Sequence, residues 1–349
     1  MITTNPSSDG TKVLLVYTGG TIGMVENPIT KGLEVCDFAY VAEHVQEINQ
    51  LPFGIDTITF DPLFDSSDAG TDLWVHIAEV ILKYYDSYDG FVVLHGTDTM
   101  AYTASGLSFM FENLGKPVIL TGSQVPIGKL RTDGKDNLLT ALEIAASKDE
   151  SGNSSVNEVC VLFNNRLLRG NRCTKISADQ FYAFQSPNYP NLADVGIDIN
   201  FDRSVILPYP KGPINIHTSV DTNVLILKIF PGLTPEVIET CISAPNLRGI
   251  VLETFGSGNA PSNERFMKLI RQAVADDIVV VNVTQCPKGK VQMKRYETGC
   301  TLLRAGVLSG YDMTTEAASA KLMYLLGQCD NPKDVRYWMD INLRGEFTK

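Results

Sequence analysis

The chain of 349 residues is 44% hydrophobic and 20% charged, which is the composition of a folded globular protein. Its 29 basic and 40 acidic residues give a net charge of −11, which argues against nucleic acids and anionic membranes as partners. Because this length exceeds one ordinary hydrophobic core, two domains are expected.

Other features of the composition narrow the class of protein. No uninterrupted apolar segment approaches the roughly 20 residues that span a bilayer, and the first residues do not resemble a secretory signal. The seven cysteines are scattered without CxxC spacing and predict free thiols in a reducing cytoplasm. The four histidines are isolated from one another, so a zinc site is not expected.

Short β-rich runs alternate with longer segments of helical period through the first part of the chain. Strands are predicted at 12–18, 56–60, 90–95, 116–122 and 158–163, and helices at 72–88, 99–115 and 135–147. Strands this apolar on both faces are typical of a parallel sheet that helices cover on each side. The sequence therefore predicts a doubly wound α/β domain.

The alternation breaks at a proline-rich segment. Three prolines fall close together within 204–221, which we interpret as a linker between a domain at 1–203 and another at 222–349. Beyond the linker, strands are predicted at 223–230, 249–255 and 278–285, and helices at 235–243, 263–277 and 315–328. A second, smaller α/β domain is therefore expected.

Three of the predicted strands are followed by loops rich in small hydroxyls and carboxylates. The first strand is followed by TGGTIG, the second by DPLFDSSDAG and the third by HGTDTM. Ligands of an open parallel sheet gather beyond the carboxyl ends of its strands. We therefore expect these three loops to face one crevice.

The TGGTIG loop has two interpretations. Its glycines resemble a phosphate cradle, but a dinucleotide fingerprint runs straight into a helix and a P-loop ends in Gly-Lys-Ser/Thr, and this loop does neither. The alternative is that the glycines turn the chain tightly and expose one hydroxyl, that of Thr18 or Thr21, in a reactive cleft.

The HGTDTM loop also has two interpretations. Thr97 and Asp98 stand just before a predicted helix, where capping of the helix N-terminus is their ordinary structural role. The functional alternative is that Gly96 makes the turn and both side chains point into the crevice beside Thr21. A hydroxyl nucleophile needs a base, and Lys175, after the fifth predicted strand, is a candidate, although a loop lysine is more often a solvated charge.

Together these motifs resemble those of the bacterial-type L-asparaginases. The resemblance rests on YTGGTIG around Thr21, HGTDTM around Thr97 and Asp98, DSS at 65–67, and GNRCTK ending in Lys175. In the second half of the chain, GSGNAP, VNVTQC and NLRGE are similar to the cytoplasmic type I branch. The similarity covers nearly the whole chain.

The resemblance implies a two-domain asparaginase-like fold, with a larger N-terminal domain and a smaller C-terminal domain, in homodimers or homotetramers. It implies hydrolysis of the side-chain amide of L-asparagine without cofactor or metal. Thr21 would be the nucleophile that forms an acyl-enzyme, and Thr97, Asp98 and Lys175 would form the accompanying triad. The group that deprotonates Thr21 stays open between the Thr97–Lys175 pair and Tyr296.

The resemblance also implies which residues bind the substrate. Asp65 and Ser66 would hold the α-ammonium and α-carboxylate of the amino acid, and Asp98 would meet the ammonium as well. Gly96 and Thr97 would complete this binding site.

Residues of the second half carry further expectations and two departures from the family pattern. Tyr296 matches a tyrosine that reaches the site from the neighbouring subunit, although an aromatic packed at an interface is an equal alternative. Relatives often carry a tyrosine in the loop after the nucleophile, where this chain has Leu33. Asn259 and Cys286 are candidates for an allosteric asparagine site, but Glu253 stands where that site has an arginine, so cooperativity is in doubt.

A secondary activity of an asparaginase and two alternatives to an asparaginase remain open at this point. Glutamine is one methylene longer than asparagine, a difference that enzymes discriminate by only about 1–3 kcal/mol, so minor glutaminase activity is allowed. A non-catalytic amino-acid sensor would keep the groups that bind the substrate but would not need Lys175. A nucleotide-binding protein would require the fingerprint that the first loop lacks.

Overall fold

The computed structural model describes residues 2–5 and 10–349, and it divides into two compact units. The first unit is Met1–Ile216 and the second is His217–Lys349. Residues 215–216, which lie inside the predicted linker, form a short strand that pairs within the first unit.

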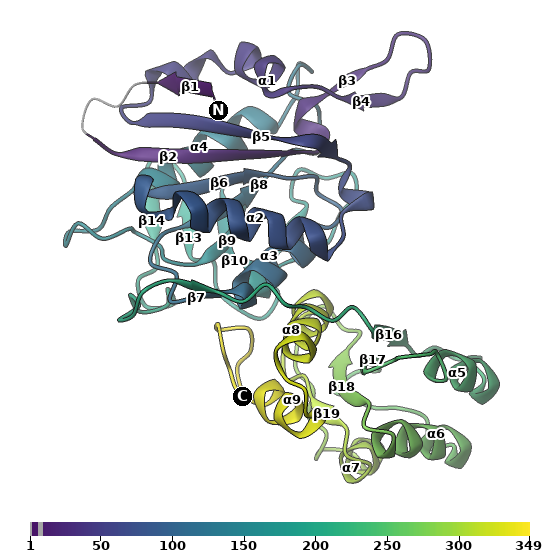
Figure 1. Ribbon diagram of the computed structural model, residues 1–349. Helices are drawn as coiled ribbons and strands as arrows, with labels where there is room; N and C mark the ends of the chain where they lie inside the picture. Colours follow the sequence, from purple (N-terminus) through teal and green to yellow (C-terminus); the bar gives the residue numbers. More distant parts are fainter. Residues whose placement is uncertain (1, 6–9) are drawn as a thin grey trace. The chain divides into compact units, whose positions relative to one another are not determined.

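A nine-stranded sheet forms the middle of the first unit (Figure 1). Its order is β1-β5-β2-β6-β8-β9-β10-β13-β14, with parallel pairing from β5 to β9 and antiparallel pairing toward both edges. The strands are β1 (Ile2–Asn5), β2 (Lys12–Gly19), β5 (Gly54–Phe64), β6 (Gly90–Leu94), β8 (Val118–Thr121), β9 (Val159–Phe163), β10 (Arg166–Arg169), β13 (Ala193–Val195) and β14 (Ile199–Phe201). The predicted fold class is confirmed, and the antiparallel strands at the edges extend it.

The central strands are buried on both faces because helices cover each side of the sheet. Val13, Leu15 and Tyr17 of β2 belong to one hydrophobic core, and Leu14 and Val16, which point to the opposite face, are also fully buried. The helices of this unit are α1 (Phe38–His44), α2 (Thr71–Tyr84), α3 (Met100–Met110) and α4 (Gly134–Ala146). Figure 1 shows α2 and α3 on one side of the sheet and α4 on the other.

Short elements fill the connections. They are the hairpin of β3 (Met24–Glu26) and β4 (Leu33–Val35), the ribbon of β11 (Thr174–Lys175) and β12 (Phe184–Gln185), the pair β7 (Phe111–Glu112) and β15 (Asn215–Ile216), and the 3-10 turns η1 (Thr21–Gly23), η2 (Gln46–Gln50), η3 (Ser66–Asp68), η4 (Tyr85–Ser87) and η5 (Gly170–Arg172). The first strand of the sequence pattern, β2, is therefore followed by η1 and a hairpin. The dinucleotide-binding alternative lacks the strand-to-helix turn that it requires.

The second unit has a smaller sheet that is wholly parallel. Its strands, in spatial order, are β16 (Val224–Lys228), β17 (Gly249–Thr254), β18 (Val279–Thr284) and β19 (Leu308–Ser309). The helices are α5 (Pro235–Ile242), α6 (Glu264–Ala275), α7 (Glu297–Arg304), α8 (Thr315–Gln328) and α9 (Pro332–Met339). Ile250 and Leu252 of β17 share a core with Ile270 of α6, and Figure 1 shows α8 and α9 on the other side of the sheet.

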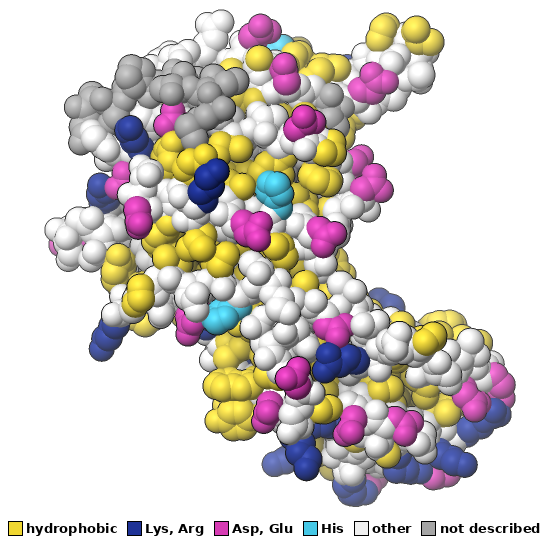
Figure 2. Space-filling view, viewed as in Figure 1, with side chains coloured by type: hydrophobic (Ala, Val, Ile, Leu, Met, Phe, Trp, Pro, Cys, Tyr) yellow, Lys and Arg dark blue, Asp and Glu magenta, His cyan; other side chains and the backbone are white. Residues whose placement is uncertain are grey.

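Two properties of the described chain concern its surroundings: the distribution of charge on its surface and the length and apolar character of its helices. Figure 2 shows acidic and basic side chains interspersed over the visible face of both units. Within residues 2–5 and 10–349, no helix combines the length and the apolar character needed to cross a bilayer.

Candidate active site

Three neighbouring strand ends meet in the first unit, because β5, β2 and β6 are adjacent in the sheet. Two glycines bring the backbones into direct contact. A Cβ on Gly19 would lie 2.2 Å from the carbonyl oxygen of Phe64, and a Cβ on Gly20 would lie 2.5 Å from the amide nitrogen of Gly96. Both glycines have positive φ values, 125° and 91°, so this close approach requires glycine for two independent reasons.

The turn that carries Thr21 is held on both sides. The N–H of Gly23 donates to the carbonyl of Gly20 at 3.2 Å, and the N–H of Ile127 donates to the carbonyl of Ile22 at 3.0 Å. Ile22 is fully buried, whereas Thr21 is half-buried. The turn thus anchors its middle residue and leaves the threonine accessible.

Thr97 and Asp98 do not cap the helix that follows them. Helix α3 begins at Met100, its N-cap is Thr99, and no side-chain hydrogen bond caps the helix. The Lys175 ammonium instead donates to Thr97 Oγ1 at 2.8 Å and to Asp98 Oδ1 at 2.6 Å. The capping interpretation is wrong.

Lys175 is not the solvated loop charge of the structural alternative. It lies on β11, where it pairs with Phe184 of β12, and its side chain is only 19% exposed. Thr97 is 6% exposed and Asp98 has a side chain that is 63% exposed. The cluster therefore runs from a buried hydroxyl through a mostly covered ammonium to a carboxylate that faces solvent.

Asp65 and Ser66 stand beside this cluster. The Asp65 carboxylate accepts from the N–H and the hydroxyl of Ser67, at 2.9 and 3.0 Å, and so holds the start of η3. Ser66 is buried, and its Oγ accepts from the N–H of Asp98 at 3.3 Å. A Cβ on Gly96 would lie 2.4 Å from Ser66 Oγ, so the absence of a side chain there makes room for the serine.

Gln124 also contacts the cluster, and the sequence reasoning missed it. Thr97 Oγ1 donates to Gln124 Oε1 at 3.2 Å, and Gln124 Nε2 donates to the carbonyl of Gln180 at 3.2 Å. Both carboxylate oxygens of Asp133 accept from the backbone N–H of Gln124 at 3.0 Å. Burial raises the pKa of Asp133, and the N–H groups that it accepts oppose this rise. Gln124 follows β8, so the search of strand ends would have found it if extended to the fourth strand.

His95 is the histidine nearest to these loops, and its surroundings are structural. It is buried, with Nδ1 at 2.7 Å from the carbonyl of Gly96 and Nε2 at 3.0 Å from Thr103 Oγ1. A carbonyl only accepts, so Nδ1 carries the proton and Nε2 accepts from the threonine. Burial lowers the pKa of His95 to about 4, which keeps the ring neutral.

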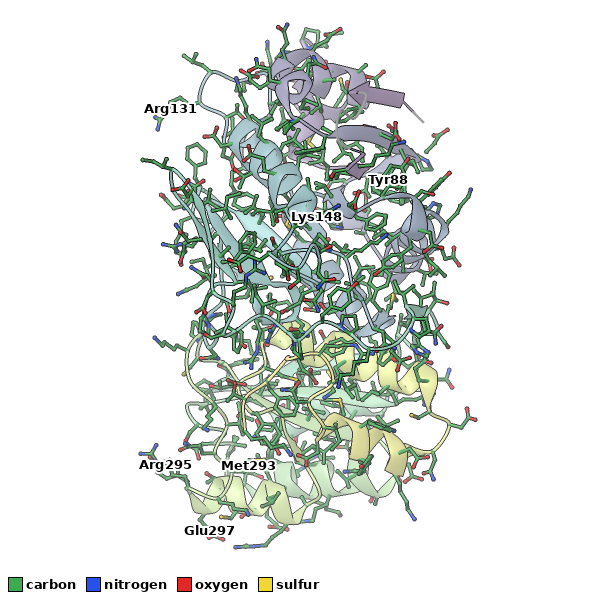
Figure 3. The ribbon with its side chains drawn as sticks, turned by 90° about the vertical axis from the view of Figure 1, so that its left-hand side faces the viewer. Tyr88, Arg131, Lys148, Met293, Arg295 and Glu297 are labelled. Carbon is green, nitrogen blue, oxygen red and sulfur yellow. The ribbon has the colours of Figure 1, made fainter. Side chains whose placement is uncertain are left out.

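A cavity of about 640 Å³ adjoins the loop that carries Gln124. Its lining combines apolar and charged side chains from the β3–β4 hairpin and two loops: Leu33, Val125, Pro126, Lys129, Arg131, Asp179, Gln180 and Phe181. Figure 3 shows that Arg131, one of these lining residues, extends outward from the unit. Among the described residues, no group of three or more His, Cys, Asp and Glu side chains is placed to hold a metal ion.

The remaining predicted residues belong to the second unit. Tyr296 precedes α7 and is 48% exposed, and the flanking Arg295 and Glu297 point outward from the unit (Figure 3). Asn259 Oδ1 accepts from Thr298 at 3.0 Å, and Cys286 is an exposed free thiol.

Cys286 and Arg295 line a separate cavity of about 350 Å³, whose other residues are Gly256, Ser257, Thr284, Lys288, Gly289, Lys290 and Gln292. Glu253, the residue that departs from the family pattern, has a side chain that is only 13% exposed. Its carboxylate accepts from Thr315 and lies 3.5 Å from the Lys228 ammonium.

Comparison with known proteins places the chain among the amidohydrolases. The chain belongs to the asparaginase family, because the model described as Asparaginase, N-terminal, matches residues 12–207 and the Glutaminase/Asparaginase C-terminal domain matches residues 223–339. It is 47% identical over 342 residues to L-asparaginase 1 of Escherichia coli, a match that covers 96% of this chain and 98% of that protein.

Two solved structures are also similar. L-asparaginase I from Vibrio cholerae is 44% identical with a TM-score of 0.87, and the match covers 97% of this chain and 99% of that one. The thermostable L-asparaginase from Thermococcus kodakarensis is 34% identical with a TM-score of 0.88, over 97% and 100% of the two chains. The family and the enzyme class that the sequence motifs indicated are confirmed.

Proposed function

We propose that the protein hydrolyses the side-chain amide of L-asparagine to L-aspartate and ammonia through a threonine acyl-enzyme. The observation that carries the proposal is the Lys175 ammonium, which bonds Thr97 and Asp98 in the loop that backs onto the Thr21 turn. Similarity over nearly the full length to proteins named L-asparaginase supports this choice of substrate.

Thr21 is the proposed nucleophile. Its Oγ attacks the side-chain amide carbon, the C–N bond breaks, and ammonia leaves with the proton that the hydroxyl gives up. Backbone N–H groups of the glycine-rich turn are suited to stabilising the oxyanion. Water then attacks the ester, its proton passes toward Thr97 and the Lys175 amine, and aspartate leaves as the Thr21 hydroxyl is restored.

The proposed substrate-binding residues carry complementary charge. Asp98 binds Lys175 through Oδ1 and remains largely exposed, so its carboxylate can also face the α-ammonium of the substrate. Asp65 is exposed beside it, and Ser66 offers a hydroxyl within the same loop cluster. Glutamine carries the same α-groups on a longer stem, so we expect weak glutaminase activity.

Assembly and compartment are part of the same proposal. We expect a homodimer or homotetramer in which Tyr296 serves the site of the neighbouring subunit, a role that its exposed ring supports. The seven cysteines are all free thiols, which supports a reducing cytoplasm as the compartment. Glu253 would repel a substrate carboxylate at an allosteric site near Asn259 and Cys286, so we expect little cooperativity with asparagine.

Steady-state ammonia release from L-asparagine and L-glutamine tests the proposal. Thr21→Ala should abolish turnover, and Thr240→Ala, on the exposed face of α5, is the matched control that should not. Hydroxylamine added during turnover should divert the acyl-enzyme of the wild type to aspartate hydroxamate. Binding of asparagine without ammonia release would favour the amino-acid sensor, and full activity in Thr21→Ala would remove Thr21 from the mechanism.

A further inference from the structure

A row of hydrogen bonds through the active-site cluster has a fixed direction. It begins at the backbone carbonyl of Gln180, which can only accept, so the amide nitrogen of Gln124 must face it. The amide oxygen of Gln124 therefore faces Thr97 and accepts the single proton of its hydroxyl. With that proton committed, the oxygen of Thr97 can only accept from Lys175.

We propose that Gln124 is a positioning residue: it sets this direction, so that Thr97 accepts from the Lys175 ammonium in the free enzyme. Asp98, whose Oδ1 accepts from the same ammonium at 2.6 Å, favours that charge independently and is unchanged in the variants below. A hydrogen bond that is made to the charged form of a group favours that form. The proposal rests on the function above, in which Lys175 takes up a proton through Thr97. For that step Lys175 must first lose a proton to solvent, and the Thr97 hydroxyl has to turn away from Gln124 and toward the resulting amine.

The backbone of Gln124 is held independently of its side chain. The Asp133 carboxylate accepts from the N–H groups of Gln124 and Val125, at 3.0 and 3.1 Å, and from Asn137 Nδ2 at 3.2 Å. A change of the Gln124 side chain leaves all of these bonds in place. Its role can therefore be tested without removing the loop that carries it.

Gln124→Met and Gln124→Glu separate the proposed role from a structural one. Methionine keeps the length of the side chain but accepts no strong hydrogen bond, so the Thr97 hydroxyl becomes free to donate to a neutral Lys175 amine. Glutamate keeps the acceptor and adds a negative charge that favours the ammonium. The two variants should therefore shift the protonation of Lys175 in opposite directions.

Two measurements report the protonation of Lys175. One is the acid limb of the pH profile of kcat/KM on asparagine, which follows the free enzyme. The other is competitive acetylation of Lys175 by trace acetic anhydride, read by mass spectrometry at a series of pH values, which requires no turnover. In Gln124→Met, both midpoints should move down by about one pH unit, equivalent to a tenfold change in protonation, and in Gln124→Glu both should move up.

A control variant and the acetylation midpoints distinguish the proposed role of Gln124 from a structural one. Gln50→Met, on an exposed 3-10 turn, should leave both midpoints unmoved. Unmoved acetylation midpoints in both Gln124 variants would overturn the proposal, including the case in which kcat/KM falls equally at all pH values. If the wild type releases no ammonia from asparagine, the proposed function fails, and the acetylation midpoints alone still support or overturn the role of Gln124.

Discussion

The Lys175→Met variant should separate catalysis from stability. The side chain of Lys175 is mostly covered and bonds both Thr97 and Asp98, so its loss removes the only ammonium that joins these two groups among the described residues. Loss of a positioned proton-transfer group typically costs about 10² to 10⁴ in rate. A fall of about 10³ corresponds to about 4 kcal/mol of transition-state stabilisation.

The cost to folding should be far smaller. Asp98 has a side chain that is 63% exposed, so water can solvate its carboxylate when the lysine is gone. Ion pairs with such an exposed partner contribute about 0–1 kcal/mol to stability, and methionine retains most of the apolar stem of the lysine. The variant should therefore fold like the wild type and turn over far more slowly.

The assay compares kcat for ammonia release with urea unfolding in the same preparations. Lys148→Met is the matched control, because Lys148 pairs with Asp89 at 3.1 Å. Asp89 precedes β6 and Asp98 follows it, so the two ion pairs stand at opposite ends of one strand. The control should lose a similar amount of stability and no activity. A Lys175→Met enzyme within about threefold of the wild-type kcat, far below the 10² that a proton-transfer group supplies, would refute the reasoning.

Three further predictions concern packing and buried charge. Gly96→Ala places a Cβ 2.4 Å from Ser66 Oγ, so the serine should be displaced and KM for asparagine should rise by about tenfold, the equivalent of one hydrogen bond; an unchanged KM in steady-state kinetics would separate Ser66 from binding. Burial lowers the pKa of His95 from 6.5 to about 4. The unfolded chain therefore binds that proton first, and about 3 kcal/mol of unfolding free energy should be lost as the pH falls through this interval. Urea unfolding of wild type and His95→Gln at both ends of the interval measures the loss, and equal pH slopes would contradict it. Glu346→Gln leaves the fully buried Lys321 ammonium without its carboxylate and should cost about 3–5 kcal/mol. Lys321→Met added to Glu346→Gln should recover part of this stability in thermal unfolding, because no buried ammonium is then left unpaired and the glutamine still accepts from the N–H groups of Leu343 and Arg344; an equally unstable double variant would contradict the explanation.

Strand and helix periodicity predicted the centre of the first unit well, because its strands are buried on both faces. The antiparallel edge was not predicted, although its signal is local. Asn164 and Asn165 have φ values of 48° and 63°, and they join β9 to β10 in a tight hairpin. The edge strands that follow are only a few residues long, too short to show a period of two.

Gln124 shows why a candidate site predicted from motifs is incomplete. Its side chain has no distinctive neighbours in the sequence, and its contacts come from Thr97 and from Gln180, 56 positions further along the chain. What matters about the Gln124 side-chain amide is the direction of its hydrogen bonds. That direction depends on the backbone carbonyl of Gln180, which no sequence pattern marks. The strand-end rule marks the position of Gln124, which follows β8, but the direction of its hydrogen bonds has to be found from the fold.

The two interpretations of HGTDTM could not be separated by local sequence, because a helix cap and a catalytic pair use the same residue types before the same helix. What separates them is the partner. A capping side chain bonds an N–H within its own first turn, whereas Asp98 bonds an ammonium 77 positions away. Such a contact brings the carboxylate no closer to the helix and does nothing to satisfy its first N–H groups. The composition of the loop would allow its side chains to cap the helix, but Asp98 forms a long-range charge pair instead. This pair is therefore the first candidate for the chemistry.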